Sequence, residues 1–566
     1  MGAAQHSGMA LSKDISGRSV DIEAAARATQ RADDGGDICA TTSIFNIYSR
    51  RQKAATLLVC SLGTCLVPVS DTIYLPALAA VQRDLGTTDT LVATSVAVYM
   101  YMVGLGALLF GPTADKFGRR ITLLGSTALF TALSLVTVFS KNIGMLLVLR
   151  ALQGFVVSSC STTSNAILAD IFAPSERGKA MGIASIPFLV GPVIGPLLGG
   201  GLSQSLGWRS TFAALTIAGG LVLIVQLLVI QETHHFYAAR RVRASKGGEA
   251  VVFVEEIHAP HFDPPYQPLW HLVDRHIAPF AIVTVTLFAC MFSTMIILPI
   301  VLSLPPYSFS ESIIGVATGV PFGVGGLIAA PIGGLMADRC ARRWAGALEG
   351  RMVYATIMAL AVFPLGALLF GWGMHFTIPA AAALLGGFFI NFSMTSHMPA
   401  TMSLISIHKQ RYAAAAGGGL HALQFIAAGV LVQATPTGTA AMGVGPWMSM
   451  LVGVAIAVTI ISGVIVVTSI RAAPAASAAG GSPAPRDEEE ASAVGPSSSQ
   501  GPAPPVASSD LGSHGTGRPG SPLSPPRARS SDAPDVPSRG GSQPQRRASA
   551  ELALEALEGI QGVQGA

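Results

Sequence analysis

The stretch GPTADKFGRR, residues 111–120, and its near copy GLMADRCARR, residues 334–343, decide how this sequence is interpreted. Each stretch follows a long apolar run and gathers charges, although charged residues make up only 12% of the chain. A soluble chain averages about 25% charged residues. The two stretches therefore mark corresponding ends of apolar segments in a duplicated unit.

Apolar runs dominate the sequence between about residues 54 and 470, and each run ends in a short polar cluster. About twenty residues at a rise of 1.5 Å match a hydrocarbon core of about 30 Å. With 50% hydrophobic residues and a mean hydropathy of +0.54, the chain is predicted to be an all-α polytopic membrane protein. We predict twelve transmembrane helices in two pseudo-symmetric six-helix bundles, near residues 55–78, 91–112, 121–140, 145–167, 180–203, 211–231, 277–301, 312–336, 352–372, 377–400, 412–433 and 446–470.

The Lys and Arg residues predict the orientation of these helices. They gather in alternate connections between the spans, whereas the opposite connections hold only Arg83, Lys141 and Arg209. Connections rich in Lys and Arg face the cytoplasm. Both termini are therefore predicted to be cytoplasmic, in the plasma membrane or, as the alternative, the vacuolar membrane.

The composition changes along the chain predict five segments. The C-terminal segment is rich in Ser, Pro, Gly and Ala, and such a sequence buries too little apolar surface to fold. Its last stretch, ELALEALEGIQG, is interpreted as a frayed tail, and a short helix that forms a recruitment site is the alternative. The predicted segments are a disordered tail at 1–53, a six-helix bundle at 54–232, a mobile cytoplasmic linker at 233–276, a second bundle at 277–471 and a disordered tail at 472–566.

The two charged stretches are similar to the loop signature Gly-x3-Asp-Arg/Lys-x-Gly-Arg-Arg/Lys of the major facilitator superfamily of secondary transporters. The resemblance covers about residues 50–471; the first copy matches throughout, and in the second copy Ala341 replaces the second glycine. It implies a major facilitator fold and a cytoplasmic gate in which Asp115, Arg119 and Asp170 pair. Positive charge that only sets topology is the alternative, but it does not explain the aspartates or the glycine spacing. The predicted gate residues are Gly111, Asp115, Lys116, Gly118, Arg119, Arg120, Asp170, Asp338, Arg339, Arg342 and Arg343.

The fifth predicted span contains GPVIGPLLGG, residues 191–200, which resembles the antiporter signature of the twelve-span drug:proton antiporter branch. The stretch QET, residues 231–233, adds a resemblance to the fungal quinidine-resistance-like transporters within that branch. Small residues four apart allow helices to approach closely in lipid. We expect this stripe to meet the glycines of the eighth span, Gly315, Gly319 and Gly323, either as a moving contact or as a static seam. The motif residues are Gly191, Pro192, Gly195, Pro196, Gly199 and Gly200.

Two charged residues inside the predicted spans are candidates for proton coupling. Arg150 lies in LRALQG, which matches the Arg-x-x-Gln-Gly motif of the resembled branch, where this arginine is tied to proton transfer. Asp71 is the one carboxylate well inside the first six spans, and burial favours the protonated form of a carboxylate. The alternative is that Asp71 lies near the outer headgroups and only accepts hydrogen bonds. A mostly apolar substrate cavity is expected around Tyr74, Gln153, Asn391, His421 and Gln424.

These features predict proton-coupled efflux of small amphiphilic molecules by alternating access. The substrate would be a drug or a secreted metabolite such as a glycolipid or an organic acid, and the partners would be protons and membrane lipid. A nutrient sensor built on a transporter fold and a proton-coupled importer are the alternatives. No arrangement typical of an enzyme, a cofactor site, a metal site or nucleic-acid binding is found in the sequence, and a monomer is expected.

Overall fold

The computed structural model of the protein describes residues 43–245, 262, 264–344, 347–409 and 412–478. Most of the two predicted tails, including the stretch at 551–562, lies outside the described residues. The described part consists of helices and their connections and contains no strand, so the predicted all-α fold is confirmed.

The first half begins with a capped helix. The backbone N–H of Gln52 donates to Ser49 Oγ at 3.3 Å, and the backbone N–H of Ser49 donates to Gln52 Oε1 at 2.9 Å. This reciprocal capping box fixes the start of the first span at Arg50, within the segment predicted as a disordered tail. The elements of this half are η1 (Ile44–Asn46), α2 (Arg50–Thr72), η2 (Leu75–Ala77), α3 (Leu78–Leu85), α4 (Asp89–Phe117), α5 (Arg119–Val138), α6 (Ile143–Ile171), α7 (Pro174–Leu206) and α8 (Arg209–Val229).

The second half repeats this plan with one interrupted span. The ninth predicted span is divided into short helical pieces, one of which, η4, is a π-helical turn. The remaining elements are α9 (His235–Ser245), α10 (Gln267–Trp270), α11 (Ala278–Ser303), α12 (Glu311–Arg343), η3 (Leu348–Met352), α13 (Val353–Ile357), η4 (Met358–Val362), α14 (Phe363–His375), α15 (Ala380–His408), α16 (Ala413–Met442) and α17 (Val444–Ala478).

Eleven helical segments of the described chain are long and apolar enough to cross a membrane. The predicted tenth span, α15, is not one of them, because Asn391, Ser393, Thr395, Ser396 and His397 lower its hydropathy. It is nevertheless a helix of 29 residues that packs against both α12 and α14. The polar residues are buried against these neighbours, so α15 still takes the place of the fourth helix of its half.

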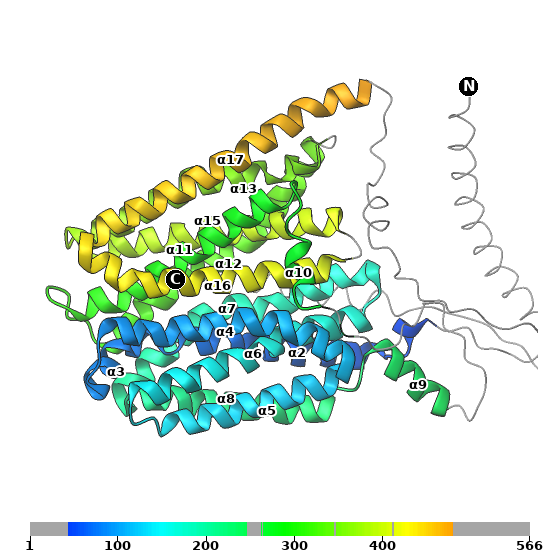
Figure 1. The fold of residues 1–566 in the computed structure, drawn as a ribbon, viewed down its shortest axis with the longest axis horizontal. Coiled ribbons are helices and arrows are strands. Elements are labelled where there is room, and N and C mark those ends of the chain that lie inside the picture. The colour runs from blue at the N-terminus through cyan, green and yellow to red at the C-terminus, as the bar shows by residue number, and fades with distance from the viewer. Residues whose placement is uncertain (1–42, 246–261, 263, 345–346, 410–411, 479–566) are drawn as a thin grey trace, which may run out of the picture. The chain divides into compact units, whose positions relative to one another are not determined.

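The two halves contact each other mainly through two helix pairs, α4 with α16 and α7 with α12 (Figure 1). A Cβ at Gly104 would lie 2.7 Å from the carbonyl oxygen of Ala422, and one at Gly319 would lie 2.7 Å from that of Val193. The predicted meeting of the fifth and eighth spans is therefore confirmed.

The face of α7 that meets α12 is not the predicted one. The stripe of Gly191, Gly195 and Gly199 packs on α2 within the same half, where a Cβ at Gly191 would lie 2.5 Å from Pro68 Cγ. The α12 glycines contact Val193, Pro196 and Gly200 instead. A spacing of four residues shows that side chains share a face, but it does not say which neighbour that face meets.

The described part of the linker includes a helix packed on the first half, although the sequence predicted a mobile segment. In α9, Ala239 packs in a cluster with Ile44, and the hydroxyl of Tyr237 donates to the carbonyl of Lys116 at 3.2 Å. This helix lies at the end of the bundle that contains Gly118, which the Lys and Arg distribution predicts to be cytoplasmic.

Candidate functional site

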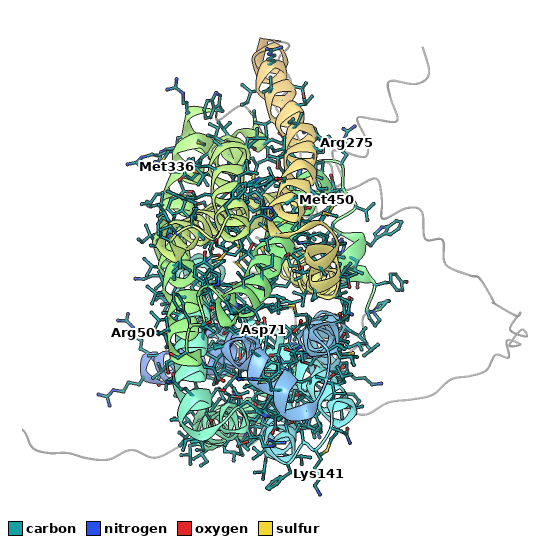
Figure 2. All side chains as sticks on the ribbon, turned by 90° about the vertical axis from the view of Figure 1, so that its left-hand side faces the viewer. Arg50, Asp71, Lys141, Arg275, Met336 and Met450 are labelled. Atoms are coloured by element: carbon teal, nitrogen blue, oxygen red, sulfur yellow. The ribbon has the colours of Figure 1, made fainter. Side chains whose placement is uncertain are left out.

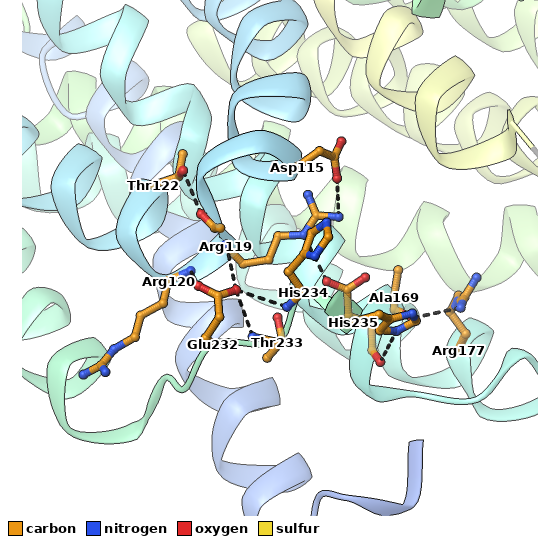
Figure 3. Close-up of polar contacts among 12 residues, drawn as sticks. Asp115, Arg119, Arg120, Thr122, Ala169, Arg177, Glu232, Thr233, His234 and His235 are labelled. Atoms are coloured by element: carbon orange, nitrogen blue, oxygen red, sulfur yellow. Dashed lines mark hydrogen bonds and ion pairs between the residues drawn. The ribbon is translucent and has the colours of Figure 1, made fainter. Parts of the chain in front are cut away.

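Arg119 joins the ends of three predicted spans (Figure 3). Its Nη2 lies 2.6 Å from Asp115 Oδ1 at the end of α4, and its Nε lies 3.0 Å from Asp170 Oδ2 near the end of α6. The arginine side chain is only 10% exposed, so solvent screens these ion pairs weakly. The structure therefore brings together the three residues that the sequence predicted as the centre of a gate.

The turn between α4 and α5 requires a glycine at position 118. Gly118 has a φ of +99°, which side-chain-bearing residues rarely adopt, and a Cβ there would lie 2.6 Å from Glu232 Oε2. At Gly111 the nearest atom to a Cβ, in Thr162, would be 3.9 Å away, an ordinary contact. Of these two motif glycines, only Gly118 is dictated by backbone geometry and space.

Glu232, which follows α8 in the chain, caps the N-terminus of α5. Its carboxylate accepts the backbone N–H groups of Arg119 at 2.9 Å and Arg120 at 3.2 Å (Figure 3). The same carboxylate accepts the N–H groups of Thr233 and His234, each at 3.1 Å. Gly118, which precedes α5, has no side chain to cap with, so a carboxylate from another segment satisfies the helix end and its dipole. Sequence reasoning missed this role, and the resemblance of QET to a transporter group was its only signal.

His234 and His235, which follow Glu232 in the chain, lie beside the ion pairs of Arg119 (Figure 3). His235 Nε2 lies 3.0 Å from the carbonyl oxygen of Asp170. Burial lowers the pKa of His234, and the positive charge of Arg119 lowers it further. The nearby carboxylates raise the pKa by a smaller amount, so the net shift is downward. The start of the linker thus places two histidines next to the ion pairs of Arg119.

The second charged stretch does not form an equivalent set of ion pairs. Asp338, Arg339 and Arg342 are exposed on α12, and the Arg343 guanidinium lies 5.6 Å from the ring centroid of Trp344. Within the described chain, Asp338 joins no ion pair with Arg342 or Arg343. The two copies are therefore alike in sequence and unlike in contacts.

Arg150 is fully buried among aromatic rings of the first half. Its guanidinium lies 4.1 Å from the ring centroid of Tyr99 and 5.4 Å from that of Tyr74, and its Nη1 donates to the carbonyl of Ser70 at 3.1 Å. A desolvated cation over ring faces gains cation–π stabilisation. Nε and Nη2 have no hydrogen-bond partner among the described residues. An arginine with unused donors in an apolar interior is suited to respond to a nearby change of charge.

Asp71, on α2, is close enough to this arginine to interact with it electrostatically, and it is only 1% exposed. Figure 2 shows its place among the helices. Its Oδ1 lacks a hydrogen-bond partner in the described part of the chain, although the carboxylate interacts electrostatically with Arg150. One residue further on, α2 ends at Thr72, against which Gly195 of α7 packs. The predicted proton residue and the predicted antiporter motif therefore meet on one turn of α2, a proximity that the sequence did not show.

The five predicted cavity residues lie in several places. Gln153 donates to Ser134 and Thr137 of α5 at 3.2 and 3.1 Å, so it joins helices within the first half. Asn391 donates to the carbonyl of Phe322 in α12. Both contacts join helices within one half and do not form a shared pocket wall.

His421 and Gln424 pair on one face of α16, as their spacing predicted. His421 Nδ1 lies 2.8 Å from Gln424 Oε1, and the His421 ring stacks on Phe188 of α7 at a centroid distance of 5.9 Å. This pair therefore lies at the boundary between the halves. A separate cavity of about 140 Å³ lies near α3, the start of α4 and the end of α11, and it is lined by Leu78, Ala79, Gln82, Asp89, Val92, Ala93, Ile300, Ser303 and Leu304.

Two halves of membrane-length helices, with a buried Asp–Arg site and a charged cluster at one end, are the architecture of a polytopic transporter. The chain matches the Major Facilitator Superfamily over residues 60–434 and therefore belongs to this family of membrane transporters.

Curated relatives of the chain are fungal transporters. The chain is 34% identical over 186 residues to the MFS antiporter QDR3 of Candida albicans, covering 33% of this chain and 27% of that protein. It is 28% identical over 362 residues to the efflux pump radE of Floropilus chiversii, covering 59% and 65%. It is 34% identical over 188 residues to citrate exporter 1 of Aspergillus niger, covering 33% and 36%. Each match spans less than two thirds of the relative.

Solved transporters share the fold at low sequence identity. The xylose transporter XylE from E. coli, in a partially occluded inward open conformation, matches with a TM-score of 0.56 and 15% identity over 72% of this chain and 97% of that one. A bacterial homologue of the human lysosomal transporter Spinster matches with a TM-score of 0.51 and 14% identity over 77% of this chain and all of that one. At these identities the matches show the fold alone.

Proposed function

We propose that the protein exports small amphiphilic molecules in exchange for protons by alternating access. The substrate class is a drug or a secreted metabolite, such as a glycolipid or an organic acid. The names of the relatives, which include an antiporter, an efflux pump and a citrate exporter, support export. The protein is proposed to act as a monomer in the plasma membrane, in contact with lipid and with both termini in the cytoplasm.

The observation that carries this proposal is the position of Asp71. Its carboxylate is buried, lacks a partner at Oδ1 and adjoins the turn of α2 on which the glycine stripe of α7 packs. Movement of α7 along that stripe changes the packing around Asp71 and hence its access to water. A buried carboxylate that meets water alternately from the two sides loads and releases one proton per cycle.

The energy available to such a cycle is sufficient for export. One proton entering the cell supplies about 1.4 kcal/mol per pH unit and about 2.3 kcal/mol per 100 mV of membrane potential. Arg150 is proposed to stabilise the deprotonated carboxylate, because its electrostatic interaction with Asp71 is the nearest available compensation in the apolar interior. The ion pairs of Arg119 with Asp115 and Asp170 are proposed to hold the cytoplasmic gate closed while the opposite side is open.

Proton release on substrate binding tests the proposal directly. The full-length protein in detergent and weak buffer is mixed with rhodamine 6G or citrate, and a pH dye reports the protons released. We expect release by the wild type and by the control Asp84→Asn, which removes an acid paired with Arg209 at the other end of the helices. Asp71→Asn is expected to abolish release. Undiminished release from Asp71→Asn removes this carboxylate from the mechanism.

Transport direction is tested in proteoliposomes. An exchanger accumulates substrate on the side from which protons leave, so reversing the imposed pH gradient reverses substrate movement. Movement of substrate in the same direction as the protons contradicts antiport and supports import.

A further inference from the structure

We propose that His276, Glu349 and His408 bind a divalent transition-metal ion of the zinc class at the predicted cytoplasmic end of the second half. Each of the three residues offers one ligand atom, and these atoms all lie within 4.8 Å of one another. They come from the end of the linker, from η3 and from the last residue of α15. This site is independent of the proton and substrate residues and goes beyond the proposed transport function.

The donor atoms match the preferences of zinc-class ions. His276 Nδ1 lies 2.6 Å from Glu349 Oε1, and the His276 and His408 rings meet edge to face with centroids 5.0 Å apart. His408 Nε2 is buried and has no hydrogen-bond partner among the described residues. Two imidazoles and one carboxylate are a known ligand set for Zn²⁺ with a fourth position left to water. Mg²⁺ and Ca²⁺ prefer sites made of oxygen atoms alone.

The surrounding residues hold the ligands in place. The Glu349 side chain is only 6% exposed, so its carboxylate is already desolvated. Asp274 Oδ1 accepts the backbone N–H of His276 at 2.9 Å, and Asp274 Oδ2 lies 3.2 Å from Lys409 Nζ, next to His408. One carboxylate therefore fixes the chain on both sides of the site, as outer partners of metal ligands do.

An ion can reach the site, and one neighbour competes with it. The His276 side chain is 33% exposed, which leaves a path from water. Arg275 Nε donates to His276 Nε2 at 3.0 Å, so the imidazole proton is on Nδ1 and points at Glu349. A metal ion at Nδ1 replaces that proton, which leaves to solvent, and Nε2 then carries a proton and no longer accepts from Arg275. Removing Arg275 is therefore expected to strengthen metal binding.

The site occupies the place in the second half that an ion pair occupies in the first. In the first half, Arg119 at the start of α5 and Asp170 near the end of α6 fasten the third and fourth predicted spans. In the second half, Glu349 precedes the ninth span and His408 ends the tenth. A bound ion would fasten these two ends and would also attach the end of the linker through His276.

The experiment uses the full-length protein, purified without a His tag, stripped with a chelator and titrated with Co²⁺ and then Zn²⁺. We expect one equivalent of Co²⁺ with visible d–d absorption, displacement by Zn²⁺, and a higher melting temperature with the ion bound. Glu349→Gln and His408→Ala are expected to lose the absorption, whereas His375→Ala, at an exposed position on the opposite side of the protein, keeps it. Asp274→Asn should weaken binding about 10- to 100-fold.

Arg275 is exposed, and the variant Arg275→Ala tests the site through a change in Zn²⁺ affinity without removing a ligand. It is expected to bind Zn²⁺ more tightly than the wild type, with an unchanged elution volume in gel filtration. Wild-type protein that binds no Co²⁺ up to about 100 μM overturns the proposal. Equal binding by the wild type and a folded His408→Ala variant overturns it as well.

Discussion

Arg119, the first residue of α5, donates through Nε to Asp170 near the end of α6 at 3.0 Å. The same guanidinium pairs with Asp115, so one nearly buried cation serves two carboxylates. Loss of the cation leaves two neighbouring negative charges without compensation, whereas loss of either carboxylate still leaves a pair. The cluster therefore depends more on its arginine than on either acid.

Replacing Arg119 is expected to destabilise the first half and to stop transport. Arg119→Ala should lower the free energy of unfolding by about 3 kcal/mol, because removal of one partner strands buried charge. Arg119→Lys should recover part of this loss, since lysine keeps the charge but not the planar fork that reaches both acids. Thermal unfolding in detergent measures both effects.

Arg120→Ala is the matched control for Arg119→Ala. Among the described residues, its guanidinium donates to the carbonyl of Leu227 alone, at 3.3 Å, and the backbone N–H bond to Glu232 survives the substitution. The idea of a shared guanidinium is wrong if Arg119→Ala unfolds no earlier than this control.

Glu232 is expected to stabilise the start of α5 by capping it. Glu232→Ala removes the acceptor of the Arg119 and Arg120 amides, at a cost of about 1–2 kcal/mol typical of a lost cap. Glu232→Gln keeps one acceptor oxygen and should cost less. Hydrogen–deuterium exchange of the peptide that begins at Arg119 should be faster in Glu232→Ala.

The control for the cap is Gln231→Ala, which removes a side chain that accepts a hydrogen bond from the exposed Arg241 at 3.3 Å. If exchange at the start of α5 is as slow in Glu232→Ala as in this control, the cap contributes nothing and solvent satisfies the helix end.

The sequence was sufficient to predict the fold and the ion pair between Asp115 and Arg119 for one physical reason. Membrane-length apolar runs are set by the bilayer, and Asp115 and Arg119 lie four residues apart across one tight turn. The third partner, Asp170, was located by family resemblance. Local spacing and a repeated motif are therefore enough to predict the helices and the ion pair of Asp115 with Arg119.

Contacts between distant segments were beyond the sequence. Glu232 reaches α5 across more than a hundred positions, and nothing in its neighbours specifies that contact. His276 and Glu349 likewise meet only because the second half folds, so no short motif marks the proposed metal site. The glycine stripe of α7 is the intermediate case, since its face was evident and its partner helix was not.

That stripe is expected to be intolerant of added volume. A Cβ at Gly199 would collide with the backbone carbonyl of Ile73 in the first span, whereas a Cβ at Gly201 meets nothing within 4 Å. Gly199→Ala should therefore destabilise the protein by about 1–3 kcal/mol through overpacking. It should also slow transport, because α7 can no longer pack closely at the end of α2.

Gly201→Ala makes the same chemical change two residues away and controls for helix propensity. It should unfold at or slightly above the wild-type temperature, since alanine favours a helix over glycine. Equal melting temperatures for the two variants would show that α7 does not pack on α2 as described.

The stability of the folded protein is expected to depend on pH through His234, which lies beside Arg119. Burial lowers the pKa of this histidine in the folded protein, and the Arg119 charge adds to the effect. In the unfolded chain the group titrates near its ordinary value of about 6.5. As the pH falls below about 6.5, the unfolded chain therefore binds more protons than the folded protein, and stability decreases toward the lower folded pKa. Above about 6.5 the contribution is complete and constant.

His234→Gln removes this proton linkage and should flatten the decrease in melting temperature between about pH 6.5 and 5. His375→Gln replaces an exposed histidine on the opposite side of the protein and should follow the wild type. If the melting temperature of His234→Gln falls with acid as steeply as that of the wild type, His234 is not the group that takes up the proton. The decrease must then come from other groups, and the histidines beside Arg119 do not make the folded protein sensitive to acid.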